Sequence, residues 1–410
     1  MEKNQGRILG LTTSSHALMH IYELSLAALI LAIATEFKAS LFAVGVIANV
    51  FALTFGFAAL PAGVLADRFG SRNTLLITWG VATLASLLVG FTSSLYMLAV
   101  WLGLLGLAIG LYHPAGYALI TRGFPQPGLA LAYHGMAGSL GVALSPFLAG
   151  IIAAMLGWRA PFIIYALPAL LLMLVACFSS VQETSLGSKH TKDTAPAAWG
   201  SLRPTLLPLT LTYLVSLFHG FIYRGGLTFL PAYLQQRLGF HILGISPEAL
   251  AASMATLALL VGILGQYAGG ILSDKVRLET LFVAFSAAVA VALVFMANTD
   301  GAWLLFSTAF FAFFNFFGQP VGIALLAKYT PLPMQGRSLG IFFLANGGIG
   351  SFSASFSGQI ADVWGLPTIY FVQSIFGFLA LLLAILLFRY ALSRQKKGLP
   401  ASGDKPPVTG

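Results

Sequence analysis

Long apolar stretches alternate with short polar segments along the whole chain. A helix needs about 20 consecutive apolar residues to cross the hydrocarbon core of a bilayer. Twelve stretches reach that length, at residues 15–36, 42–66, 73–93, 96–120, 129–156, 160–180, 205–235, 247–273, 279–298, 302–327, 338–361 and 367–390. Strands of a membrane barrel would alternate apolar and polar residues, and these stretches do not. The pattern predicts an all-α membrane protein with twelve transmembrane helices.

The composition excludes most other classes of protein. Of the 410 residues, 58% are hydrophobic and 8% are charged, whereas soluble domains carry roughly 25% charged residues. A soluble enzyme or a disordered protein therefore does not fit. The chain has one cysteine, Cys177, which excludes an intramolecular disulfide and a cysteine-based metal site.

The longest polar stretch, 181–204, divides the apolar stretches into two sets of six. It contains Ser, Thr, Lys and Pro and predicts a solvated linker. We therefore expect an N-terminal six-helix bundle at 1–180, a cytoplasmic linker at 181–204 and a C-terminal six-helix bundle at 205–392. Residues 393–410 predict a disordered cytoplasmic tail.

The positive residues predict the orientation in the membrane, because cytoplasmic loops carry the excess of Lys and Arg. If both termini are cytoplasmic, 17 of the 21 Lys and Arg residues lie on that side, and only Lys38, Arg159 and Arg237 lie outside. We therefore expect a multi-pass protein of the cell (inner or plasma) membrane with both termini in the cytoplasm. Since the positive charge is spread over loops, the net charge of +9 does not indicate nucleic-acid binding.

The two halves of the chain repeat each other. A Gly-x-Leu-x-Asp-Arg segment at 63–68 recurs as Gly-x-Leu-x-Asp-Lys at 270–275. Similarly, His113-Pro114 in the fourth stretch corresponds to Gln319-Pro320 in the tenth. Parallel repeats of this kind place a binding site between the halves, near the middle of the membrane. The two bundles are therefore expected to be pseudo-symmetric.

The segment at 63–72 resembles the signature loop of the major facilitator superfamily of secondary transporters. The matching residues are Gly63, Leu65, Asp67, Arg68, Gly70 and Arg72. The second copy keeps Asp274 and Lys275 but lacks the later Gly and Arg. This resemblance extends over roughly residues 10–392 and implies the major facilitator fold with transport by alternating access.

The stretch at 129–156 is similar to the glycine and proline motif of drug–proton antiporters. The matching residues are Gly138, Gly141, Pro146 and Gly150. His20 and Glu23 on the first helix, with His113 on the fourth, look like the fosmidomycin-resistance branch of exporters. The resemblance implies proton-coupled export of a drug-like compound.

Charges inside the spans indicate a candidate site without reference to any family. A charge at the centre of a span costs about 2.5–3.5 kcal/mol on insertion scales, so it should face protein or water. Only Glu23 and Arg224 lie well inside spans, at corresponding positions of the two repeats. His16, His20 and Glu23 follow the spacing i, i+4, i+7 and share one helix face.

We expect Glu23 to carry the coupling proton, with His20 and His113 as further proton carriers. Burial favours the neutral acid and a nearby guanidinium favours the carboxylate, so protonation of Glu23 would release Arg224. The residues expected to bind substrate are Arg224, Tyr223, Asn315 and Gln319. Two alternatives remain: Glu23 and Arg224 could form a static pair between the halves, and the histidines could serve only helix–helix hydrogen bonding.

The signature loop predicts a conformational latch. Arg68 and Arg72 can pair with Asp67 and with helix C-termini, which would hold one conformation. The residues assigned to the latch are Gly63, Asp67, Arg68, Gly70, Arg72, Asp274 and Lys275. The alternative is a charge cluster that only fixes the orientation.

The favoured function is proton-coupled export of a small amphipathic or anionic compound by alternating access. The alternatives are uptake of an organic anion or metabolite, with Arg224 as its counter-ion, and a non-transporting membrane sensor. We find no nucleophile–base pair in the sequence that would indicate an enzyme. We also find no phosphate-binding loop that would indicate ATP as the driving force. We expect no metal site, because the histidines lie on different helices, and no cofactor besides the proton gradient. The expected state is a monomer whose partners are a small-molecule substrate, protons and the bilayer.

Overall fold

The computed structural model describes residues 3–124, 128–178, 205–239, 242, 244–330, 338, 341–342 and 344–397. Within these residues every regular element is a helix. The elements are α1 (Lys3–Phe37), α2 (Leu41–Phe69), α3 (Ser71–Gly90), α4 (Leu95–Gly110), α5 (Tyr112–Gly123), α6 (Gly128–Leu156), α7 (Ala160–Phe178), α8 (Leu206–Arg237), α9 (Pro247–Ser273), α10 (Leu278–Asn298), α11 (Gly301–Tyr329), η3 (Leu344–Gly348), η4 (Ile349–Phe352), α13 (Ser353–Trp364) and α14 (Leu366–Lys396). The predicted linker at 181–204 lies outside the described residues.

Eleven helical segments in the described part of the chain are long and apolar enough to cross a membrane, with α4 and α5 counted together. The elements η3, η4 and α13 occupy the remaining predicted stretch. The all-α prediction is therefore confirmed, and the elements agree with twelve spans.

Two helices are longer than the hydrophobic pattern predicts. The first, α1, begins at Lys3 instead of residue 15, and α14 continues to Lys396, into the segment predicted as a disordered tail. Hydropathy measures only apolarity, whereas polar residues such as Lys, Arg and Gln are also good helix formers. Basic residues in the last turn of α14 also favour the helix end, because they face its partial negative charge.

The fourth predicted span is broken in two at Leu111, between α4 and α5. Pro114 explains the break, since a proline lacks the backbone N–H and its ring clashes with the carbonyl four residues earlier. That residue is Gly110, where α4 ends. The break places His113 in the first turn of a new helix, directly after the turn.

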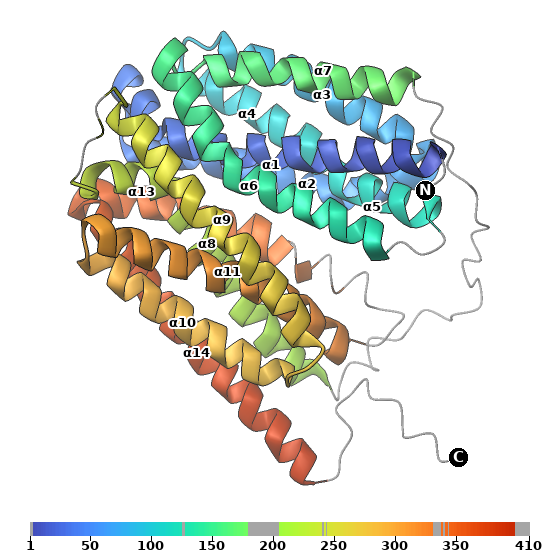
Figure 1. Ribbon diagram of the computed structural model, residues 1–410, viewed down its shortest axis with the longest axis vertical. Helices are drawn as coiled ribbons and strands as arrows, with labels where there is room; N and C mark the ends of the chain where they lie inside the picture. The colour runs from blue at the N-terminus through green and yellow to red at the C-terminus, as the bar shows by residue number, and fades with distance from the viewer. Residues whose placement is uncertain are drawn as a thin grey trace.

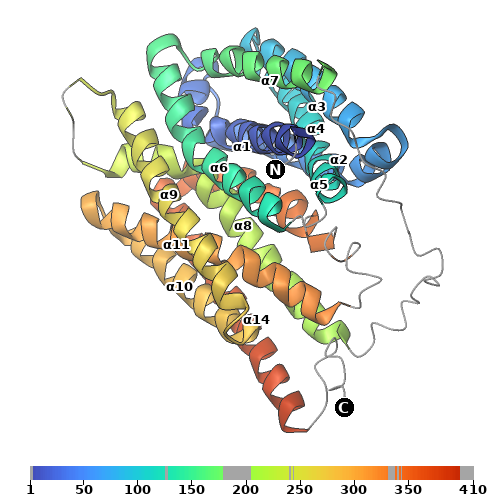
Figure 2. The same ribbon diagram turned by 45° about the vertical axis from the view of Figure 1, so that its right-hand side comes forward.

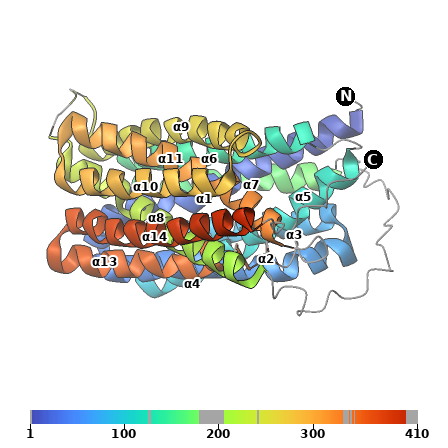
Figure 3. The ribbon, with the colours of Figure 1, turned by 90° about the horizontal axis from the view of Figure 1, so that it is seen from below.

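The chain folds into two bundles, α1–α7 and α8–α14 (Figure 1). The helices α1, α3 and α7 of the first bundle are inclined to α10 and α14 of the second, and the turned view shows the same division (Figure 2). Seen from below, the long helices of both bundles run roughly side by side (Figure 3). Contacts between the bundles are made by α6 with α9, α2 with α13 and α1 with α8.

Polar contacts join the bundles at the end where α1 finishes and α2 begins, which we call the closed end. The carboxylate of Asp362 accepts hydrogen bonds from the backbone N–H of Leu41 (2.9 Å) and of Phe42 (2.8 Å). The N–H of Phe147 donates to Thr256 Oγ1 over 3.1 Å. The Asp362 contacts favour the N-terminus of α2, whose first amides have no partner within the helix.

Glycines allow α2 and α13 to approach closely at the closed end. A Cβ atom at Gly45 would lie 2.6 Å from the carbonyl oxygen of Ala354. A Cβ atom at Gly358 would meet the backbone of Leu41. These distances leave no room for a side chain, so the two backbones touch directly.

The opposite end, where α1 begins and α2 meets α3, is the open end. Tyr133 of α6 and Tyr267 of α9 are 48% and 72% exposed there. The repeat-related glycines of the signature loop, Gly63 and Gly270, have no atom within 4 Å of the place where a Cβ would lie. Side chains at this end are thus more exposed than those at the closed end, although Ser139 of α6 still donates a hydrogen bond to Gln266 of α9.

Candidate functional site

An ion pair connects the bundles between their two ends. Glu23 Oε1 on α1 lies 2.6 Å from Arg224 Nη2 on α8, and the two side chains are 4% and 12% exposed. The structure thus brings together the two charges that the sequence placed inside spans. Because an unpaired buried charge is costly, each side chain stabilises the other in its position.

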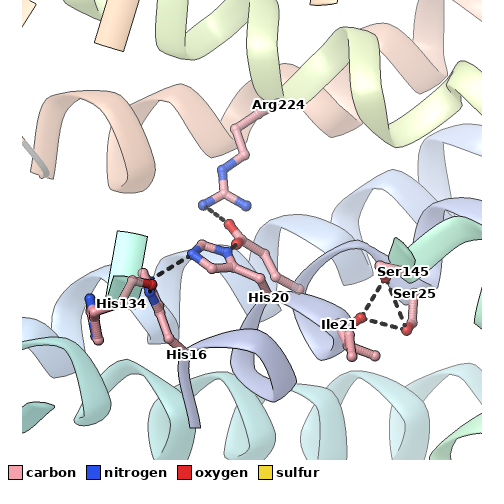
Figure 4. Close-up of polar contacts among 8 residues, drawn as sticks. His16, His20, Ile21, Ser25, His134, Ser145 and Arg224 are labelled. Carbon is pink, nitrogen blue, oxygen red and sulfur yellow. Dashed lines mark hydrogen bonds and ion pairs between the residues drawn. The ribbon is translucent and has the colours of Figure 1, made fainter. Parts of the chain in front are cut away.

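His20 and His16 extend the polar contacts of this ion pair along α1 (Figure 4). The second carboxylate oxygen of Glu23 lies 2.5 Å from His20 Nδ1. His20 Nε2 lies 3.2 Å from His16 Nε2, and His16 Nδ1 lies 2.7 Å from the backbone carbonyl of His134 on α6. The predicted stripe at i, i+4, i+7 is therefore a continuous chain of polar contacts.

A second group of rings packs behind this chain. The ring of His113 on α5 meets those of His16 and His20 edge-on, with centroids 5.1 and 5.8 Å apart. His134 Nε2 lies 2.9 Å from the hydroxyl of Tyr112, which donates to the carbonyl of Thr12. The short helix α5 thus supplies both His113 and the tyrosine that holds His134.

No metal site was expected from the sequence, because the histidines lie on different helices, but the structure brings three of them together. One ring nitrogen from each of His16, His20 and His113 lies within 4.8 Å of the others. The break between α4 and α5 brings His113 beside α1, which a separation of about 90 residues in the sequence could not indicate.

A small cavity lies beside the ion pair, on the side of the closed end. Glu23 and Arg224 form part of its wall. Other lining residues are Tyr22, Phe51, Leu102, Tyr223, Thr228 and Ser351. The wall is otherwise mostly apolar, so the ion pair is its main electrostatic feature.

The predicted substrate-binding residues differ in position. Tyr223 lines the cavity, and the guanidinium of Arg224 lies 5.9 Å from the centre of its ring. Neither Asn315 nor Gln319 on α11 is among the residues that line this cavity. Asn315 is buried, whereas Gln319 is exposed and accepts a hydrogen bond of 3.5 Å from Gln266 of α9.

Two hydroxyl-bearing residues of the cavity, Thr228 and Ser351, were not predicted from the sequence. Thr228 lies one turn after Arg224, and its hydroxyl donates to the carbonyl of that residue. Spacing of i, i+4 from a buried charge could have found it. Ser351 lies in η4, where irregular backbone interrupts the predicted helix, so periodicity gave no signal.

The signature loop lies at the open end. Gly70, between α2 and α3, has a φ of +83°, which favours glycine. Arg72 donates from Nε to the carbonyl of Ala176 (2.7 Å) and from its guanidinium to that of Cys177, at the C-terminal end of α7. Arg68 is exposed, and the side chain of Asp67 lies outside what the structure describes. The helix-end contact expected of this loop is thus made by Arg72, within the first bundle.

The second copy of the loop contains a different arrangement. Asp274 and Lys275 are exposed at the end of α9. At the position that corresponds to Arg72, Glu279 is fully buried and lies 3.2 Å from Lys328 Nζ and 3.3 Å from Arg277 Nε. It also accepts a hydrogen bond from the hydroxyl of Tyr329. The repeat position therefore holds a buried ion cluster in place of an arginine.

The glycine and proline motif forms contacts on two sides of α6. A Cβ atom at Gly138 would meet the ring of His16, and one at Gly141 would meet the backbone of Ala17. One at Gly150 would meet Ala252 of α9, in the other bundle. Next to Pro146, Ser145 donates to the carbonyl of Ile21 over 2.6 Å, as Ser25 does (Figure 4). The motif thus joins α6 both to α1 and to the second bundle.

Several known proteins are similar to this chain over most of its length. It is 26% identical over 342 residues to a probable sulfoacetate transporter of Cupriavidus necator, covering 75% of this chain and 77% of that protein. It is 28% identical over 376 residues to a hexuronate transporter of Bacillus subtilis, covering 81% and 86%. A tetracenomycin C resistance and export protein of Streptomyces glaucescens is 32% identical over 135 residues, which is 32% of this chain and 25% of that protein.

The fold is also similar to solved structures. An inward-facing, unoccupied bacterial homologue of the human lysosomal transporter Spinster superposes with a TM-score of 0.79 at 15% identity, covering 96% of this chain and 98% of that one. The sequence profile of the Major Facilitator Superfamily matches residues 13–246 and 241–409. Two six-helix bundles, the signature loop and this match lead to one conclusion: the chain is a transporter that belongs to the Major Facilitator Superfamily.

Proposed function

We propose that this transporter moves a small organic anion together with a proton, by alternating access of a site between its two bundles. The observation that carries the proposal is the pairing of Arg224 with Glu23 beside an otherwise mostly apolar cavity. A guanidinium binds carboxylate, sulfonate and phosphate groups through paired hydrogen bonds. The guanidinium of Arg224 is thus able to bind an anionic substrate whenever its ion pair with Glu23 is broken.

A proton would control that release. Protonated Glu23 is neutral and no longer holds Arg224 by charge, so an incoming anion can replace the carboxylate. The chain from His134 through His16 and His20 leads to the same carboxylate and consists of imidazole rings, whose nitrogens can both accept and donate a proton. Proton and anion would then occupy the site together, which corresponds to symport.

The orientation completes the proposal. The excess of Lys and Arg supports a cytoplasmic open end, and the described conformation would then be the inward-facing one of a plasma-membrane protein. Contacts at the closed end would have to separate, and the signature loops at the open end approach, for the site to face outward. We propose a monomer that uses the proton gradient and no other cofactor.

The relatives support an anionic substrate. The proteins that align over most of this chain include the sulfoacetate and hexuronate transporters, and both substrates named there are small organic acids. Export remains the second candidate, because the motif of α6 resembles that of antiporters and because a resistance and export protein aligns over a third of the chain.

Substrate-induced proton movement in proteoliposomes tests the proposal. Purified protein is reconstituted with a pH-sensitive dye in the lumen, and sulfonates, uronates, aldarates and drug-like compounds are added outside in turn. Symport of an anion would acidify the lumen, whereas antiport of a drug would make it more alkaline. Alkalinisation with drugs alone, and no response to any organic acid, would contradict anion symport.

A further inference from the structure

The contact between His16 and His20 needs a positive species between the two rings. His16 Nδ1 lies 2.7 Å from a backbone carbonyl, which can only accept, so this nitrogen carries the hydrogen. His20 Nδ1 faces the Glu23 carboxylate that is paired with Arg224, so it too carries the hydrogen. Each neutral ring then presents a lone pair at Nε2, and the two Nε2 atoms lie 3.2 Å apart. Two lone pairs at that distance repel unless a cation lies between them.

The spacing fits a metal ion. Two imidazole nitrogens bound tetrahedrally to zinc at about 2.0–2.1 Å are roughly 3.3–3.4 Å apart, close to the distance observed between the two Nε2 atoms. Histidines at i and i+4 on a helix face are a usual source of two zinc ligands. His113 offers a third nitrogen within 4.8 Å.

The hydrogen-bond partners of the two Nδ1 atoms are also typical of metal-binding histidines. Metal-binding histidines donate their other N–H to a carboxylate or a backbone carbonyl, which fixes the ring and raises its basicity. His20 has the carboxylate of Glu23 in that role, and His16 has the carbonyl of His134. Both contacts hold the Nε2 atoms toward each other.

We propose that His16, His20 and His113 bind one divalent transition-metal ion of the zinc class. His113 would move its ring nitrogen inward by about 1.5 Å to reach tetrahedral spacing, and its position directly after the break at Leu111 allows this. Three protein ligands leave a fourth coordination position for water or an anion. A set of three imidazoles selects Zn²⁺, Co²⁺, Ni²⁺ or Cu²⁺ over Mg²⁺ and Ca²⁺.

The other titratable groups that face the cluster are His134, Tyr112 and Tyr117. His134 is bonded to Tyr112, and the centre of the Tyr117 ring lies 6.3 Å from that of the His113 ring.

Direct binding tests the site without any transport assay. The full chain, purified without a histidine tag and treated with chelator, is titrated with Co²⁺ in detergent. We expect one ion per chain, the visible absorption of tetrahedral cobalt, and displacement by Zn²⁺ but not by Mg²⁺. The variants His20→Gln and His113→Gln should each lose more affinity than the roughly 10–100-fold that removal of a partner behind a ligand costs. His219→Gln, which removes a buried histidine bonded to Ser286, is the control and should bind as the wild type does.

X-ray absorption spectroscopy of the zinc-loaded wild type tests the site without any variant, so it still applies if a variant does not fold. A shell of nitrogen and oxygen neighbours at about 2.0–2.1 Å that includes imidazole scattering supports the site. Absence of a bound ion in the wild type overturns the proposal, as does unchanged affinity in a folded His20→Gln variant. In that case a proton shared by His16 and His20 explains their contact.

Discussion

In the first bundle three histidines gather beside the carboxylate of Glu23, whereas in the second bundle Tyr223 lies beside Arg224. The position that corresponds to His113 is Gln319, which cannot titrate. One copy of the repeat therefore carries side chains that can bind a proton, and the other carries a permanent cation. Duplication gave two similar scaffolds, and the difference between them supports a proton site in one half and an anion site in the other.

The signature loops differ in the same way. Arg72 in the first copy is bonded to carbonyl groups at the end of α7. The corresponding Glu279 is buried in a cluster with Lys328 and Tyr329. A guanidinium at a helix end can exchange its partners, whereas a buried carboxylate with three partners is expensive to disturb. We therefore expect the first loop to act in the conformational change and the second to stabilise its bundle.

Removing Arg224 should have the largest effect. Arg224→Ala leaves Glu23 buried without its partner, so we expect loss of anion transport and a stability loss of about 3–5 kcal/mol. Transport is measured in proteoliposomes and stability by thermal unfolding in detergent. The matched control is Arg159→Ala, which breaks the more exposed pair with Glu36 at the closed end and two hydrogen bonds to the Thr92 carbonyl. Since both partners can then bond to water, it should cost less stability than Arg224→Ala. Transport that persists in Arg224→Ala would refute the role of this cation.

Glu23→Gln should separate proton coupling from substrate binding. The amide is neutral like the protonated acid, so Arg224 becomes permanently available and substrate exchange should continue. Accumulation driven by a pH gradient should be abolished, because the proton carrier is gone. Counterflow and gradient-driven uptake are compared in the same liposomes. Gradient-driven accumulation in the variant would mean that the histidines carry the proton without Glu23.

The two loops can be compared directly with one substitution in each. Glu279→Ala leaves Lys328 and the hydroxyl of Tyr329 without their acceptor, and we expect the free energy of unfolding to fall by about 3–5 kcal/mol. Arg72→Ala should cost less, about 1–3 kcal/mol, but should alter the rate of transport per molecule. Equal effects of both variants on stability and on rate would remove the distinction between the loops.

Asp362→Asn should cost less stability than Arg224→Ala or Glu279→Ala, and it tests the contact between the two bundles. The amide loses one of two charge-assisted hydrogen bonds to the start of α2, worth about 1.5–3 kcal/mol. The closed end should open more often, so a cysteine at position 133, in a Cys177→Ser background, should be labelled more slowly. Asp300→Asn, whose partner Arg237 lies in the same bundle, is the control. Unchanged labelling would show that Asp362 does not hold this conformation.

The fold was largely predictable because the bilayer sets a length that hydropathy can detect. The pairing of Glu23 with Arg224 was predictable as well, since few charges enter spans and the repeat aligns these two. The break at Leu111 was missed, because an average over about 20 residues does not register one proline. The particular partners of His16 and His134 were not predictable, since periodicity relates residues of one helix and does not indicate which helices touch.

The direct backbone contact between α2 and α13 has a consequence for the energy supply of the cell. Gly45 and Gly358 leave no space for a side chain, and therefore none for water between the two backbones at these two positions. Ions that reached this part of the contact through the open end would meet closely packed backbone there. A bulkier residue at Gly45 would wedge the helices apart and admit water, and the membrane would then leak protons continuously even in the absence of substrate.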